Sequence, residues 1–291
     1  MANTQINISK NGTTTLATAG KYCDRNIDVN VSVAGGGSGD LAVQLMTDRA
    51  GITSVTIPDG ATQIASHAFY GCSNLDSITM LDSSNSIKNI ETYAFYGCSK
   101  LQSIDLPEGL TQIESYAFYG CSNLESISLP DGITQIKDNV FASCTKLASV
   151  GLPSNLTLIG ANAFYNCNNL ASISLRNSIK DISAKAFMNC YRLKLTKLPS
   201  NIEHIYSYAF SGCEEITITE IPSSVMFIDA YAFGDCFGLT SITFKGTPDF
   251  IEPTAFRGCD NLTTINVPWA EGAVDGAPWG ANATINYNYT V

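Results

Sequence analysis

The sequence predicts an α/β repeat solenoid, a right-handed coil in which every 23-residue repeat supplies one strand of a parallel sheet and one short helical turn. Three observations lead there: a cysteine that recurs at constant spacing, apolar residues at fixed distances from it, and an alternating segment after it. The first gap between these cysteines is 26 residues and the next seven are 23 each, in the series Cys72, Cys98, Cys121, Cys144, Cys167, Cys190, Cys213, Cys236 and Cys259. Self-similarity at such a period is typical of a solenoid, because one short unit cannot bury its apolar face without neighbours.

Apolar residues surround each cysteine at the same distances. An isoleucine lies eight residues before it, a phenylalanine three before it, and a leucine or isoleucine three after it, as Ile113, Phe118 and Leu124 do around Cys121. Because like residues of successive coils lie over one another, these positions are the predicted core.

The strand and the turn of each repeat follow from the residues on either side of the cysteine. Residues 124–130 alternate apolar and polar side chains, which indicates a strand with one buried face. Pro130 ends that strand, since proline has no N–H to donate to a sheet. Residues 115–121 resemble a short helical or 3₁₀ turn, for which Ser115 is an available cap.

Two repeats depart from the alternation. Those around Cys190 and Cys213 have Leu195 and Ile218 one residue earlier than the usual apolar position. A local bulge or shift of the strand is expected there.

The chain divides into five predicted parts. These are a small β head module at 1–34, a Gly-rich linker at 35–39, a capping half repeat at 40–58, the repeats at 59–267 and a C-terminal cap at 268–291. In the head, the Asn11-Gly12 pair is a hairpin-type turn signal. A lone hairpin is marginal in water, so the head should pair with the first coil, with a second copy of itself, or with another protein.

The two ends of the repeat region carry further expectations. Asp40 is positioned to cap a helix, and Arg49 stands where later repeats have cysteine. Trp269 and Trp279 lie in the C-terminal segment, where they either cover the open end of the core or form an aromatic binding tip.

Composition and charge exclude several function classes. The net charge of −10 argues against nucleic acid and anionic membranes, which attract basic patches. No apolar run reaches the length of a membrane span, so membrane insertion is not expected. The N-terminus does not read as a secretory signal, so either this sequence lacks one, or the protein leaves the cell by another route, or it stays in the cytoplasm.

No residues predict a catalytic, cofactor or metal site. The cysteines are too far apart for zinc pairs, and their regular placement favours reduced, buried thiols over disulfides. His67 and His204 have no partner that the sequence places beside them, so catalysis is not expected at either.

A family resemblance follows from the repeat itself. The pattern Ile-x-x-x-Ala-Phe-x-x-Cys-x-x-Leu-x-Ser-Ile-x-Leu-Pro, over roughly residues 41–268, resembles the BspA-like class of leucine-rich repeats. The resemblance implies bacterial surface adhesion to host glycoproteins or other microbes. The head segment resembles N-terminal pieces of phage tail-associated proteins.

Two surfaces are candidate binding sites. The first is a tyrosine stripe, where recurring three-residue spacing predicts adjoining rings: Tyr70, Tyr93, Tyr96, Tyr116, Tyr119 and Tyr165. The second is a serine face on the outward strand positions: Ser103, Ser126, Ser128, Ser172 and Ser174. The alternatives are that the tyrosines only pack between repeats and that the serines only form a solvated sheet.

These observations favour a non-enzymatic binding or adhesion protein at the cell surface or outside the cell. Its expected partner is a protein or glycan on a host or bacterial surface. The alternative is a phage or prophage tail-associated protein, virion-associated and docked through residues 1–34, a segment that could also mediate self-association. An enzyme has the least support.

Overall fold

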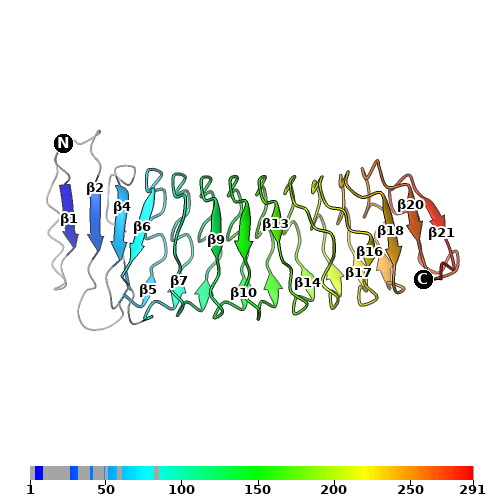
Figure 1. The fold of residues 1–291 in the computed structure, drawn as a ribbon, viewed down its shortest axis with the longest axis horizontal. Coiled ribbons are helices and arrows are strands. Elements are labelled where there is room, and N and C mark those ends of the chain that lie inside the picture. The colour runs from blue at the N-terminus through cyan, green and yellow to red at the C-terminus, as the bar shows by residue number, and fades with distance from the viewer. Residues whose placement is uncertain are drawn as a thin grey trace. The chain divides into compact units, whose positions relative to one another are not determined.

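The chain is a parallel β-solenoid that separates into two compact units. The computed structural model describes residues 4–8, 27–31, 40–41, 49, 52–57, 61–81 and 85–290. The first unit comprises residues 1–134 and 140–153, and the second comprises residues 135–139 and 154–291. Within each unit, strands of successive coils run side by side in the same direction (Figure 1).

The first unit contains two sheets and one further strand pair. One sheet has the order β1 (Thr4–Ile8), β2 (Ile27–Val31), β4 (Ile52–Ile57) and β6 (Ser77–Met80), all parallel. The other has the order β3 (Asp40–Leu41), β5 (Gln63–Ile64), β7 (Asn89–Ile90) and β8 (Gln112–Ile113). In addition, β9 (Ser126–Ser128) pairs in parallel with β11 (Ser149–Gly151).

The second unit is built in the same way. Its longer sheet has the order β10 (Gln135–Ile136), β12 (Leu158–Ile159), β14 (Asp181–Ile182), β15 (His204–Ile205), β17 (Phe227–Ile228) and β19 (Phe250–Ile251). A second sheet has the order β16 (Glu220–Ile221), β18 (Ser241–Phe244), β20 (Thr264–Asn266) and β21 (Thr284–Asn286). Ser172–Ile173 form β13.

Most repeats therefore hold two short strands, whereas the sequence predicts one. The additional strand is two residues long and ends at the isoleucine eight residues before the cysteine, such as Ile136 in β10 and Ile159 in β12. Its isoleucine is buried and its first residue faces outward. A two-residue strand is too short for alternation to reveal it.

The core consists of the residues that recur with the repeat, as predicted. The phenylalanine rings stack on one another at centroid separations of 5.1 to 5.7 Å, from Phe69 to Phe141 in the first unit and from Phe164 to Phe256 in the second. All of these rings are fully buried. Burial of one such side chain contributes about 1.5–3 kcal/mol, so the stack is a principal source of stability.

The segment before each cysteine is not helical, and the expected short helical turn is wrong. No α-helix occurs in the described part of the chain. In residues 115–121, the N–H groups of Ala117, Tyr119 and Cys121 bond to the carbonyl three residues earlier. Those of Phe118 and Gly120 bond instead to carbonyls of the next coil, at 3.0 and 2.8 Å.

This alternation follows from the backbone. Tyr116 and Gly120 have φ values of 63° and 71°, in the left-handed region, whereas an α-helix needs negative φ throughout. Every second N–H is thereby turned toward the neighbouring coil. The turns thus link successive coils on this side, much as the strands do elsewhere.

The N-terminal strands continue the repeat instead of forming a hairpin. Thr4 pairs with Ile27, and the two strands run parallel, so the hairpin interpretation of the head is wrong. The partner of β2 is β4, which fits the expectation that the head pairs with the first coil. A parallel pair needs a long crossover between its strands, and β1 and β2 are separated by residues 9–26. The Asn11-Gly12 pair and the linker at 35–39 lie outside the described residues.

The start of the capping half repeat also differs from expectation. Asp40 and Leu41 form strand β3, which pairs with β5, so a helix does not begin at Asp40. The rest of the expected helix lies outside the described residues. Arg49 stands in the cysteine position and donates hydrogen bonds to the carbonyl oxygens of His67 and Tyr70, at 3.0 and 2.7 Å.

The two irregular repeats keep their buried positions by a one-residue shift. Leu195 and Ile218 are buried, whereas Thr196 and Thr219, at the usual isoleucine position, are exposed. No strand forms between residues 194 and 199, which agrees with the expected local irregularity.

Both tryptophans are buried, so the aromatic binding tip is wrong. Trp269 and Trp279 lie 5.3 and 6.0 Å from Phe244 by ring centroids, and they meet each other edge to face. The indole Nε1 of Trp279 donates to the Asp275 carbonyl oxygen at 2.7 Å. The C-terminal segment therefore adds its aromatic side chains to the core.

Within each unit the cysteines are free, buried thiols in successive coils. All nine from Cys72 to Cys259 are free and buried, while Cys23 lies outside the described residues. In most described coils the Sγ donates to the phenylalanine carbonyl of the preceding coil, as Cys98 does to Phe69 at 3.2 Å. The sequence suggests that the cysteines act as small apolar residues, and this hydrogen bond from the thiol was not predicted. Burial raises the pKa of several of these thiols, among them Cys98, Cys190 and Cys121, the last to about 12.

Candidate functional site

The first unit brings five of the six predicted tyrosines together in two columns. Tyr70, Tyr96 and Tyr119 stack face to face with centroid separations of 4.8 Å at both steps. Beside them, Tyr93 stacks on Tyr116 at 5.0 Å, and the two columns meet at 5.6 Å between Tyr93 and Tyr96. We call these five residues the tyrosine ladder.

The ladder is reachable from solvent. Tyr70 is 39% exposed and the other four rings are half-buried. Burial raises the pKa of Tyr96, and the neighbouring tyrosines add to the shift, with Tyr119 the largest contributor among them. His67 extends one column, because its ring lies 4.9 Å from that of Tyr93.

One column is built on residues in an unfavourable backbone conformation. His67, Tyr93 and Tyr116 have φ values of 59°, 61° and 63°. The same register position holds Asn139 and Asn162 in later repeats, and asparagine is among the side chains that tolerate this region best. The turn therefore requires the left-handed conformation but does not require an aromatic ring.

Tyr165 does not belong to the ladder. It lies in the second unit, and the repeat between Tyr119 and Tyr165 has the buried Ala142 at that position. The sequence already shows this interruption of the tyrosine column, because Ala142 lies 23 residues, one full repeat, from each of the two tyrosines.

The serine face is exposed as predicted. Ser103, Ser126 and Ser128 in the first unit and Ser172 and Ser174 in the second are all exposed. Among the described residues, no side-chain hydrogen bond joins these five to one another. A column of hydroxyl groups does occur just after the cysteines. The hydroxyls of Ser99 and Ser122 each donate to the backbone carbonyl oxygen of the corresponding serine one coil earlier. This column was not predicted from the sequence.

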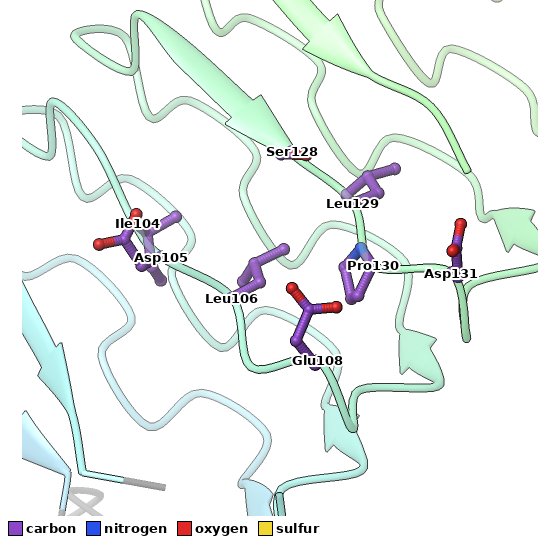
Figure 2. A pocket seen from close by; sticks show the side chains of 8 residues that line it. All are labelled: Ile104, Asp105, Leu106, Glu108, Ser128, Leu129, Pro130 and Asp131. Carbon is purple, nitrogen blue, oxygen red and sulfur yellow. The ribbon is translucent and has the colours of Figure 1, made fainter. Parts of the chain in front are cut away.

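An acidic groove lies at the edge of the serine face in the first unit (Figure 2). It has a volume of about 450 Å³. Its lining residues are Ile104, Asp105, Leu106, Glu108, Ser128, Leu129, Pro130 and Asp131. Figure 2 shows the Glu108 carboxylate between Leu106 and Pro130, with Asp105 and Asp131 at opposite ends.

Chemistry beyond binding has no support in these surfaces. Within the described ranges, no group of three or more His, Cys, Asp or Glu side chains could hold a metal ion. The His67 Nδ1 lies 2.8 Å from the Ser66 hydroxyl, and the His204 Nε2 lies 3.0 Å from the Asp229 carboxylate. Neither pair lines the acidic groove. No helix in the part that the structure describes has the length and apolarity that a membrane span needs.

Comparison with known proteins decides the family. The model of the BspA type leucine rich repeat region matches six copies, over residues 47–170, 79–194 and 157–271. These ranges cover most of the chain. The chain belongs to the BspA-type leucine-rich repeat family. Families of this kind act in protein interaction or at surfaces and are generally non-enzymatic.

Solved structures of bacterial repeat proteins share the fold of this BspA-type protein. A leucine-rich repeat protein from Bacteroides ovatus is 23% identical, covering 89% of this chain and 68% of its own, with a TM-score of 0.57. The T. pallidum leucine-rich repeat protein is 27% identical, over 58% of this chain and 77% of its own, with a TM-score of 0.51. The pneumococcal vaccine antigen PcpA is 18% identical, over 91% and 77%, with a TM-score of 0.53. No curated protein matches the sequence.

The BspA-type repeats also expose an apolar surface that the sequence analysis did not single out. Tyr206, Met226, Phe227 and Phe250 are between 36% and 48% exposed, and all four lie in the second unit. Phe227 and Phe250 are the outward residues of β17 and β19. Since the two-residue strands were not predicted, the outward direction of these side chains was not either.

Proposed function

We propose that this BspA-type protein is a non-enzymatic binding protein and that the tyrosine ladder is its contact surface. The partner is a protein or glycan on a host or bacterial surface. The serine face, which is exposed and polar, is a secondary contact region. The proposal places the protein at the cell surface or outside the cell.

The observation that carries the proposal is that two tyrosine columns meet at 5.6 Å between Tyr93 and Tyr96, with Tyr93 and Tyr116 on a left-handed backbone. For an L-residue other than glycine or asparagine, this conformation costs roughly 1–2 kcal/mol. Stacking of the two rings contributes about 0.5–1.5 kcal/mol, which roughly offsets this cost. Tyrosine therefore makes the fold little more stable than asparagine would at these positions. A role in binding explains why the chain has tyrosine there, because tyrosine anchors many protein and sugar interfaces.

The ladder also has the geometry of a contact surface. Its rings hold one another in place, so little side-chain freedom remains to be lost when a partner binds. Among the described residues no side-chain hydrogen bond engages the tyrosine hydroxyls, so they can donate to and accept from a partner, and the rings supply apolar area beside them. These properties suit a partner that carries both apolar and hydroxyl groups.

The test replaces the column by the residue that later repeats use. Tyr93→Asn with Tyr116→Asn should reduce binding to immobilised host-cell and bacterial surface extracts, and to glycan arrays, by at least about tenfold. The melting temperature should change little, since Asn139 and Asn162 already occupy this backbone conformation.

A matched control exists in the second unit. Tyr208 and Tyr231 stack at 5.0 Å and have φ values of 59° and 53°. This pair lacks the second tyrosine column, because Ser211 and Gly234 stand where the ladder has Tyr96 and Tyr119, so the same substitutions there should leave binding unchanged. Equal losses from both pairs, or a large drop in melting temperature without loss of binding, would show that the rings act in packing.

A virion-associated protein is the second candidate. Strand β1 is the last strand of its sheet, and no described strand pairs with its other edge. Such an edge can accept a strand from another protein or from a second copy of the chain. Detection of the protein on purified particles, and not on intact cells, would favour this candidate.

A further inference from the structure

The outward side chains of the longer sheet in the second unit change character along the chain. They are Gln135, Leu158 and Asp181 in β10, β12 and β14, and become His204, Phe227 and Phe250 in β15, β17 and β19. Register pairs His204 with Phe227 and Phe227 with Phe250. The three aromatic side chains therefore lie on consecutive strands of one sheet.

Two neighbours extend this surface. Tyr206 stacks on His204 at 3.7 Å, and His204 in turn lies 5.3 Å from Phe227. Met226 precedes Phe227 and is 43% exposed, while Phe250 is 48% exposed. We call Tyr206, Met226, Phe227 and Phe250 the apolar patch.

The fold does not require apolar residues at these positions. The corresponding strands of the first unit, β5, β7 and β8, have Gln63, Asn89 and Gln112 as their outward residues. At this position the same fold accepts glutamine. An exposed phenylalanine there is less favourably solvated than glutamine and adds nothing to the core. The patch therefore calls for a partner that covers it.

Carboxylates adjoin the residues of the apolar patch along the chain. Glu203 and Asp249 precede His204 and Phe250, and Asp229 and Glu252 follow β17 and β19. Lys180 pairs with Glu203 at 2.6 Å, and the imidazole of His204 contacts Asp229 at 3.0 Å. Among the described residues, no lysine or arginine forms an ion pair with Asp249 or Glu252.

We propose that the apolar patch is a docking surface for a protein segment that presents apolar side chains flanked by lysine or arginine. The apolar side chains would cover Phe227 and Phe250, and the cations would face Asp249 and Glu252. A second copy of this chain fits less well, because a symmetric contact would bring the same carboxylates together. This surface is separate from the tyrosine ladder and does not depend on its role.

The experiment selects ligands from a random linear peptide library displayed on yeast, against the full-length protein. The selected peptides are then tested, without depletion, on the variant Phe227→Gln with Phe250→Gln, which carries the residue found at this register in Gln112 and Gln135. The selected peptides should combine aromatic or aliphatic residues with a net positive charge. As synthetic peptides, they should bind the unaltered protein at least about tenfold more tightly than the double variant.

Two further variants separate the charge contribution from the tyrosine ladder. Asp249→Lys introduces the residue found at this register in Lys88 and Lys180, and it should weaken peptide binding, as should added salt. Tyr93→Asn with Tyr116→Asn should leave peptide binding unchanged. Melting temperatures of all variants should stay near that of the unaltered protein.

Several results would overturn the proposal. Peptides that bind the double variant as well as the parent would show that the patch is not the docking surface. If the selected peptides had no net positive charge, or if Asp249→Lys left their affinity unchanged, the proposed charge complementarity would be wrong. A dimer in sedimentation that Phe227→Gln with Phe250→Gln dissociates would identify a second copy as the occupant instead.

Discussion

The thiol of Cys121 donates a hydrogen bond of 3.2 Å to the carbonyl oxygen of Phe95, one repeat earlier in the chain. That oxygen also accepts the backbone N–H of Cys98, at 3.1 Å. Cysteine is small enough for the interior of the turn, and its S–H meets the second lone pair of a buried carbonyl. The recurrence of cysteine at this position thus has a physical reason beyond its size.

Replacing Cys121 should change how stability depends on pH. Cys121→Ala should lower the free energy of unfolding by about 1–2 kcal/mol near neutral pH, since packing and one hydrogen bond are lost. Burial raises the pKa of Cys121 from 9.0 to about 12, so this thiol contributes stability that is fully present below pH 9 and is lost between pH 9 and 12.

The variant lacks that contribution, so its free energy of unfolding should fall less steeply over this pH range. The difference between the slopes of parent and variant should be about 1.4 kcal/mol per pH unit. Denaturant unfolding at a series of pH values measures both slopes. Parallel slopes for the variant and the parent would contradict the assignment of the raised pKa to Cys121.

The cysteines should react as free thiols only after unfolding. Titration of the denatured protein without reductant should recover most of the ten thiols. In the folded protein the nine described ones should react slowly, because they are buried away from the reagent. Recovery of two or fewer thiols would show that the cysteines are oxidised.

Gly120 should tolerate asparagine better than alanine. Its φ of 71° is left-handed, and a Cβ there would meet nothing closer than 3.8 Å, so the backbone conformation decides the outcome. Gly120→Ala should cost roughly 1–2 kcal/mol of unfolding free energy. Gly120→Asn should cost less, because Asn166 and Asn189 hold the same register position at φ values of 59° and 63°. Thermal unfolding of the two variants gives the comparison, and equal losses would argue for a steric cause.

Removing Arg49 should affect the first complete repeat. Its guanidinium donates to the carbonyl oxygens of His67 and Tyr70, so Arg49→Ala should destabilise by about 1.5–3 kcal/mol. Desolvation raises the pKa of Cys72 to about 11, and the charge of Arg49 lowers it. The variant should therefore raise this pKa further and slow alkylation of Cys72 at alkaline pH. Arg49→Lys, which keeps the charge, should restore part of the alkylation rate. An unchanged alkylation rate in Arg49→Ala would show that the charge of Arg49 does not influence the pKa of Cys72.

The tyrosine ladder shows how much of a candidate site the sequence reveals. The recurrence of Tyr93 and Tyr96 in Tyr116 and Tyr119 predicts neighbouring rings, and the rings are neighbours. The left-handed backbone under Tyr93 is not visible in the pattern, because asparagine, lysine and histidine occupy the same position elsewhere. Phe227 and Phe250 were missed because their strands are too short to give a period.

The sequence by itself determined the period, the buried residues and the family, because stacked coils of equal length bury the same positions each time. It also determined that the thiols lie in the core, since their spacing matches that of the phenylalanines. Only the tertiary structure decided that the turns are not helical and that the N-terminal strands are parallel. Both depend on where backbone N–H groups find their acceptors. In this fold those acceptors lie one coil away, on residues that no local pattern connects.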